Sequence, residues 1–184
     1  MKVMQPFTAV LTDGRVVVPQ QSEADSLMND GYGTRAGGLL VLEPSETLFN
    51  VERGKIMVVD EKTNSSLSLS ELLRVFLETD AKAWTRFLVY RDLRTRGFVA
   101  RRDPEGLTDL VVYERGAFKK EPPNMRVAIV SEGSPESLER LHELARGIER
   151  EGLQLKLAVV DRRGEMVYYG LSERKLRDVV HEPV

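Results

Sequence analysis

The stretch from Lys82 to Arg102 concentrates positive charge that can bind a nucleic acid. It holds seven basic residues against one acid, Asp92, a surplus of six, whereas the whole chain has a formal net charge of −2. Guanidinium and ammonium groups bind phosphates without reading base sequence. The candidates for such contacts are Arg91, Arg94, Arg96, Arg101 and Arg102. Two other interpretations stay open: a solvated helix face, or arginines that pair with carboxylates and brace a domain interface.

Other reactive side chains are scarce. The chain has no Cys, which excludes disulfides, thiolate catalysis and cysteine metal sites. Its two histidines, His142 and His181, lie far apart in the sequence. His142 lies next to leucines at helical spacing, which is typical of a histidine at the boundary of a helix's buried face. His181 belongs to a charged tail. We therefore expect neither a metal site nor a cofactor.

The composition is that of a globular protein with room for one large or two small domains. Of 184 residues, 41% are hydrophobic and 30% are charged. We see no apolar run of membrane-spanning length and no signal peptide, so we expect a cytoplasmic protein without a membrane partner. The absence of Cys and the abundance of Arg and Glu are typical of thermophilic proteins and point to an archaeal-type, thermophilic source.

The first half of the chain predicts a small α+β domain. A turn at Asp13-Gly14 joins two β-rich runs, and a helix capped by Ser22 follows. Next come a strand, a helix that begins at Pro44 and ends at Gly54, and an apolar strand at residues 56–59. Leucines and Phe76 at helical spacing predict a further helix after residue 68. Asp80 marks a predicted boundary between domains at residues 1–80 and 81–184.

The second half predicts a helix at residues 81–95 and then a mixed sheet. Strands are expected at residues 98–101, 109–113 and 126–131, followed by a long helix capped by Ser134 and closed by Gly152. Two more strands, joined across residues 162–164, complete the sheet. The helix and the strands predict an α/β core for the second domain.

Three segments of the chain resemble the archaeal tRNA-splicing endonuclease (tRNA-intron endonuclease) family. The run YRDLRTRGF with the strand DLVVY, in residues 90–116, is similar to the family's Arg-Asp-Leu-Arg-x-Arg-Gly helix end and its following strand. Residues 157–172, LAVVDRRGEMVYYGLS, resemble its closing hairpin. Residues 32–58 are similar to its N-terminal domain. This resemblance implies a small α+β N-terminal domain and a restriction-endonuclease-like C-terminal domain with a mixed central sheet.

The resemblance also implies a catalytic tyrosine, histidine and lysine that cut precursor tRNA without a metal ion. Tyr113, at the end of its strand, stands at the family's tyrosine position. The histidine position falls near Pro123, which cannot transfer protons. The lysine position falls at Leu153 and Gln154, and Lys156 lies two or three residues further along. We therefore expect no functional catalytic residue in this chain, and a structural role for Tyr113.

An inactive chain of this kind is expected to assemble with a catalytic subunit, two of each, around pre-tRNA with bulge-helix-bulge junctions. In the family, the loop of the closing hairpin is acidic and docks onto a neighbouring subunit. Its counterpart is Asp161, Arg162, Arg163, Gly164 and Glu165, where two arginines interrupt the acidic run. Two alternatives stay open: an active endonuclease with a degenerate triad that uses Lys156, or a stand-alone adaptor for RNA or protein.

Overall fold

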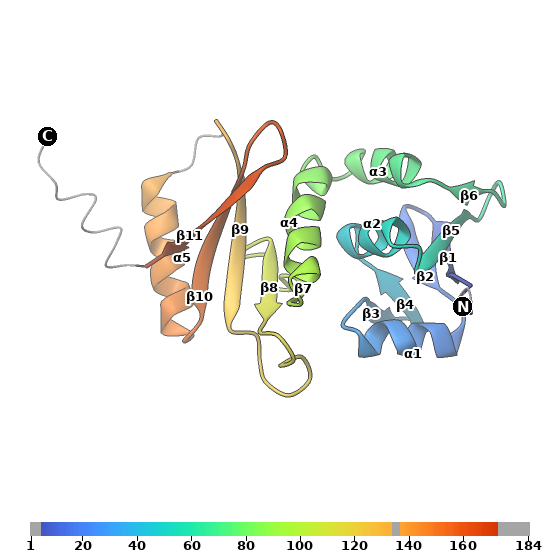
Figure 1. Cartoon of the computed structure of the whole chain (residues 1–184), viewed down its shortest axis with the longest axis horizontal. Helices are drawn as coiled ribbons and strands as arrows, with labels where there is room; N and C mark the ends of the chain where they lie inside the picture. Colours follow the sequence, from blue (N-terminus) through green and yellow to red (C-terminus); the bar gives the residue numbers. More distant parts are fainter. Residues whose placement is uncertain (1–4, 134–136, 173–184) are drawn as a thin grey trace, which may run out of the picture. The chain divides into compact units, whose positions relative to one another are not determined.

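A computed structural model describes residues 5–133 and 137–172 of the chain. The chain divides into two compact units, Met1–Arg91 and Asp92–Val184 (Figure 1). Helix α4 (Ala83–Thr95) runs across this division. The domain boundary predicted near residue 80 stays a prediction.

The first unit is built on a mixed six-stranded sheet in the order β3-β4-β2-β1-β5-β6. The predicted hairpin is present: Asp13 and Gly14 both have positive φ, which the tight turn between β1 and β2 requires. Only β1 and β5 pair in parallel, since α1, α2 and the intervening strands connect them. The strands are β1 (Phe7–Thr12), β2 (Arg15–Val18), β3 (Thr34–Ala36), β4 (Leu39–Leu42), β5 (Ile56–Asp60) and β6 (Ser66–Leu67).

The helices of this unit are α1 (Gln21–Asn29), α2 (Pro44–Glu52) and α3 (Leu69–Leu77). Helix α2 begins at Pro44 as predicted, and a reciprocal capping box between Glu43 and Glu46 caps its N-terminus. The cap predicted at Ser22 is wrong: Gln20 precedes α1 and makes no side-chain capping bond. The helix predicted after residue 68 from the spacing of its apolar residues is confirmed as α3, and Leu72 and Phe76 are buried.

A loop before β3 depends on the buried carboxylate of Glu46. The Oε2 atom of Glu46 accepts hydrogen bonds from the backbone N–H of Gly33, 2.9 Å, and of Glu43, 2.9 Å. Gly33 has a φ of 74°, and a Cβ there would lie 2.6 Å from Leu40 Cδ1 and 2.9 Å from the backbone oxygen of Val41. The chain therefore needs glycine at this close approach.

The second unit contains a mixed five-stranded sheet in the order β11-β10-β9-β8-β7 (Figure 1). Strands β9 and β10 are parallel, connected through helix α5 (Leu138–Arg150), and the other pairs are antiparallel. This arrangement confirms the predicted mixed sheet and the α+β class. The strands are β7 (Val99–Arg102), β8 (Leu110–Tyr113), β9 (Met125–Ser131), β10 (Gln154–Val160) and β11 (Met166–Leu171).

Helix α5 covers one face of this sheet, called here the α5 face. Its buried residues Ala145 and Ile148 pack with Leu155 of β10, and Leu153 and Leu171 lie against the same cluster. The described part of α5 is capped by Ser137, whose hydroxyl accepts from the N–H of Arg140. The predicted cap Ser134 lies outside the described residues.

Leu138, the first residue of α5, is 44% exposed and not part of the core. In the described residues no helix combines the length and the apolarity needed to cross a membrane.

Candidate functional site

Three strand ends meet at one edge of the second unit's sheet. The antiparallel pairing of β8 with β9 brings the C-terminal end of β8 beside the start of β9, and the parallel pairing of β9 with β10 adds the start of β10. Two backbone hydrogen bonds join these ends: Asn124 N–H donates to Val112 O, 3.2 Å, and Gln154 N–H donates to Asn124 O, 3.0 Å. The positions predicted for the family's tyrosine, histidine and lysine therefore converge at this edge.

The register of the sheet assigns each of these positions to a face. Val111, Arg126 and Leu155 form one row across β8, β9 and β10, and Leu155 packs against α5. Side chains of a strand alternate between faces, so Tyr113, two residues after Val111, projects to the α5 face. Leu153 contacts the α5 cluster and lies on that face too.

Lys156 projects to the opposite face from Tyr113. It lies in the neighbouring row, paired with Val127 of β9 and Gly170 of β11, and this row alternates with that of Leu155. Its Nζ lies 3.4 Å from the position that a Cβ on Gly170 would take, so the side chain extends over the glycine. A lysine so placed does not replace one at position 153, whereas Gln154, the other position predicted for the family's lysine, lies on the same face as Lys156.

Tyr113 is half-buried and its ring packs on Phe118 in the loop that follows β8. The two ring centroids are 5.1 Å apart at an interplanar angle of 88°, the edge-to-face geometry that aromatic pairs favour. In this loop Pro123, near which the family's histidine position is predicted to fall, is also half-buried. The edge therefore presents a phenol, a pyrrolidine ring and the isobutyl group of Leu153, of which only the phenol can transfer a proton.

The basic stretch seen in the sequence is largely engaged with other groups. Arg91 forms an ion pair with Glu52, 2.9 Å, and Arg96 forms one with Asp92, 3.1 Å. The remaining candidates also have interaction partners, namely Arg94, Arg101 and Arg102. Arg91 and Arg96 thus pair with carboxylates of their own unit, and contact with RNA stays a prediction for the five candidates.

Asp92, the single acid of that stretch, connects α4 to β11. Its Oδ2 accepts a hydrogen bond of 2.8 Å from the Tyr168 hydroxyl, and the Arg96 guanidinium lies 5.6 Å from the centroid of the Tyr168 ring. Burial raises the pKa of Tyr168, and the bond to the Asp92 carboxylate raises that pKa further. The phenol therefore stays protonated and serves as a fixed donor.

We expect Tyr168→Phe to lower the free energy of unfolding by about 1–2 kcal/mol, because a half-buried carboxylate loses a donor. Chemical denaturation followed by circular dichroism measures this loss. Tyr169→Phe is the matched control, since Tyr169 is 52% exposed on the other face of β11 and should change little. Equal losses in the two variants would contradict the role given to Asp92.

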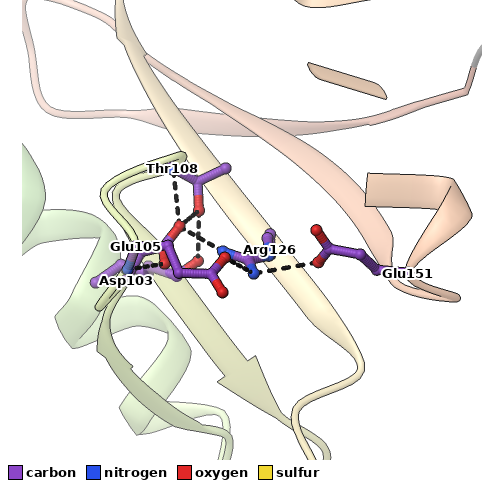
Figure 2. A network of polar contacts seen from close by, with 6 residues as sticks. Asp103, Glu105, Thr108, Arg126 and Glu151 are labelled. Carbon is purple, nitrogen blue, oxygen red and sulfur yellow. Dashed lines mark hydrogen bonds and ion pairs between the residues drawn. The ribbon is translucent and has the colours of Figure 1, made fainter. Parts of the chain in front are cut away.

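A second polar network, missed in the sequence, surrounds Arg126 on β9 (Figure 2). Its guanidinium forms ion pairs with Asp103 at 2.7 Å, Glu105 at 2.5 Å and Glu151 at 3.2 Å. The side chains of Arg126 and Asp103 are 7% and 0% exposed. The only signal in the sequence was a lone arginine within an otherwise apolar strand. The network ties the loop before β8 and the end of α5 to the centre of the sheet.

Asp103 also closes the loop before β8. Its carboxylate accepts hydrogen bonds from the N–H of Glu105, 3.0 Å, and from the N–H and hydroxyl of Thr108, 2.8 and 2.9 Å. Burial raises the pKa of this carboxyl, but these bonds and the Arg126 guanidinium together outweigh it, so the pKa lies below its ordinary value. The aspartate is an ionised structural anchor.

The tip of the β10–β11 hairpin is held by Asp161. Its Oδ1 accepts from the N–H groups of Arg163 and Glu165, each at 2.8 Å, and Gly164 N–H donates to Asp161 O at 3.1 Å. The Asp161 carboxylate is therefore directed into its own turn, and the docking of this loop onto a neighbouring subunit stays a prediction. Arg162 and Arg163 are exposed.

The histidines give no catalytic constellation. His142 lies on α5, half-buried and with interaction partners of its own, and His181 falls outside the described residues. Across residues 5–133 and 137–172, no three side chains of the metal-binding types gather as a possible ion site.

Both halves of the chain match known protein families. Residues 7–73 match the tRNA intron endonuclease N-terminal domain, and residues 83–169 match the tRNA intron endonuclease catalytic C-terminal domain. Residues 74–82 lie between the two matches. The chain thus matches both domains of a tRNA intron endonuclease.

Relatives match over nearly the full length. The tRNA-splicing endonuclease of Methanococcus vannielii is 30% identical over 175 residues, which is 95% of this chain and 98% of the relative. That of Pyrococcus furiosus is 30% identical over 169 residues, 90% and 95% of the two chains. An EndA-like protein of Methanopyrus kandleri is 29% identical over 164 residues, 89% and 95%. The chain belongs to the tRNA-splicing endonuclease family, whose enzymes act on pre-tRNA.

Proposed function

We propose that this chain is a non-catalytic, structural subunit of a tRNA-splicing endonuclease. It assembles with a catalytic subunit, two of each, and the complex cleaves pre-tRNA at bulge-helix-bulge intron junctions to leave 2′,3′-cyclic phosphate and 5′-hydroxyl ends. The observation that carries the proposal is the strand-end site, where Tyr113 lies with Leu153 and the Pro123 loop, without a second proton-transfer group or a cation at the family positions.

The chemistry of RNA cleavage explains why the side chains of this strand-end site do not support the reaction. Attack of a ribose 2′-oxygen on the adjacent phosphate needs a group that takes the proton, a group that gives one to the leaving oxygen, and a cation that offsets the developing negative charge. Tyr113 supplies at most one of the two proton transfers. Leu153 packs into the α5 cluster and stabilises no phosphorane, and Lys156 extends from the other face of the sheet.

Assembly is supported by the open side of strand β11. Among the described residues this strand ends the sheet of the second unit, and a strand in that position offers its outer backbone groups for pairing with another chain. Val167 and Tyr169 are 54% and 52% exposed, and both project to the α5 face, in register with Val159 and Leu157 of β10. Exposed apolar side chains of this size beside a strand edge are typical of a subunit interface.

The test mixes the purified chain with the catalytic paralogue from the same genome. We expect the chain alone to leave an intron-containing pre-tRNA intact, and the mixture to form a larger complex by light scattering and to cut the RNA. A chain that cuts unaided would establish the active degenerate endonuclease instead. A chain that stays monomeric and does not bind the paralogue would favour the stand-alone adaptor.

The variant Tyr113→Phe distinguishes a structural role of this tyrosine from a catalytic one. In the assembled complex, Tyr113→Phe should leave the single-turnover cleavage rate within about twofold of the original, because its edge lacks the partner groups for proton transfer. The matched control is the corresponding tyrosine-to-phenylalanine change in the catalytic subunit, which should lower the rate about 10²-fold or more. A comparable loss from Tyr113→Phe would refute the structural assignment.

A further inference from the structure

A cavity in the first unit lies where the ends of three strands meet. Strand pairing brings these ends together: Val16 of β2 pairs with Leu42 of β4, and Val41 of β4 pairs with Thr34 of β3. Phe76 of α3 also lines the cavity, whose volume is about 330 Å³. Small-molecule sites in proteins have volumes of roughly 300–1,000 Å³, so this cavity has room for a small ligand.

One wall of this cavity is apolar. Leu42 and Phe76 are buried in the core, and Val41 and Pro44 are half-buried beside them. Gly14, in the turn between β1 and β2, lines the opening, and a Cβ at this position would meet no atom within 4 Å. A ring or a short aliphatic group can therefore enter past the turn and contact the apolar wall.

The cavity also offers a positive charge that the fold does not use. Arg15 lines it and is exposed, and across residues 5–133 and 137–172 its side chain takes part in no ion pair or hydrogen bond. Arg35 of the same sheet, by contrast, pairs with Asp25 at 2.6 Å. The acidic lining residue, Glu43, belongs to the capping box of α2 with Glu46. The guanidinium of Arg15 is therefore the charged group that is available to a ligand.

An available guanidinium beside an apolar wall defines the chemistry of the ligand. Guanidinium groups bind carboxylates and phosphates through two parallel hydrogen bonds, and the apolar wall favours a ligand with an apolar part. We infer that this cavity binds a small molecule with one anionic group, a carboxylate or a phosphate, on an apolar body. The lining residues all belong to the first unit, so the inference needs neither a partner chain nor RNA and is independent of the proposed function.

The test titrates the full chain with benzoate, phenyl phosphate and the neutral analogue benzyl alcohol, and measures Kd by ligand-observed NMR. We expect saturable binding of at least one anion, and the two arms distinguish a carboxylate ligand from a phosphate ligand. Arg15→Gln should weaken this binding about tenfold or more, because it removes a charge-assisted hydrogen bond. Arg74→Gln is the matched control, since Arg74 is exposed on α3 and does not line the cavity.

A second pair of variants tests the charge without removing a side chain. Ala36 lines the cavity and is exposed, so Ala36→Asp should weaken binding of the anion by repulsion, whereas the neutral Ala36→Asn, of the same size, should change it little. Thermal melting of each variant confirms folding. The inference is overturned if neither anion binds saturably at millimolar concentration, if Arg15→Gln binds as tightly as the original chain, or if benzyl alcohol binds as tightly as the anions.

Discussion

Replacing Asp103 with alanine should lower the free energy of unfolding by about 3–5 kcal/mol, because the change leaves the buried Arg126 guanidinium without its fully buried carboxylate partner. The same change removes the acceptor for three hydrogen bonds from Glu105 and Thr108 that close the loop before β8. Urea denaturation followed by circular dichroism measures the loss. In the assembled complex, the variant should also lose thermal stability.

Glu105→Ala and Glu151→Ala are the matched controls, since both residues also pair with Arg126. Their side chains are 58% and 43% exposed, and exposed ion pairs contribute only about 0–1 kcal/mol. A loss from Asp103→Ala no larger than theirs would show that the network does not depend on its buried member.

The Asp103 anchor also gives the protein a pH dependence in acid. Its pKa in the folded protein lies below the ordinary value of 3.8. The stabilisation is therefore complete above the pKa of the unfolded chain and is lost as the pH falls through the lower pKa of the folded state. We expect the difference in unfolding free energy between the original chain and Asp103→Asn to be constant near neutrality and to shrink below about pH 4.

Gly33→Ala should lower the free energy of unfolding by about 2–5 kcal/mol, from an unfavourable positive φ and from overpacking together. The new Cβ would lie 2.9 Å from the backbone oxygen of Val41, an atom that cannot move away without disturbing β4. The shift would also displace the backbone N–H of Gly33, which donates a hydrogen bond to the Glu46 carboxylate. Thermal unfolding of the full chain measures the loss.

Gly37→Ala isolates the conformational part of this cost. Gly37 also has positive φ, 57°, but a Cβ there would meet nothing within 4 Å. Its loss should be about 1 kcal/mol, the cost of a left-handed conformation for an alanine. If both variants lose the same amount, the contact with Val41 contributes nothing.

Much of the local structure could be predicted because its determinants are short-range. The turn at Asp13-Gly14, the helix start at Pro44 and the helix end at Gly152 all follow from the backbone conformations that these residues favour. The helix cap predicted at Ser22 was wrong, because neighbouring polar residues can also occupy the capping position. Gln20 occupies it here and makes no side-chain capping bond. Such shifts of one or two residues are common at helix ends.

The sequence by itself established the family resemblance, the order of the elements, and the residues found near the family's histidine and lysine positions. These follow from residue identity along the chain, which needs no knowledge of contacts. The comparisons confirm the family, and the structural role that we propose rests on the same residue identities.

Only the tertiary structure decided which residues face one another. Lys156 follows Leu153 by only three residues, yet strand register sends Lys156 to the face opposite Tyr113 and Leu153. Pairing likewise connected Asp92 with Tyr168 and Asp103 with Arg126, and it directed the Asp161 carboxylate inward. The physical reason is that register and ion pairing depend on contacts between distant segments, which local residue preferences do not specify.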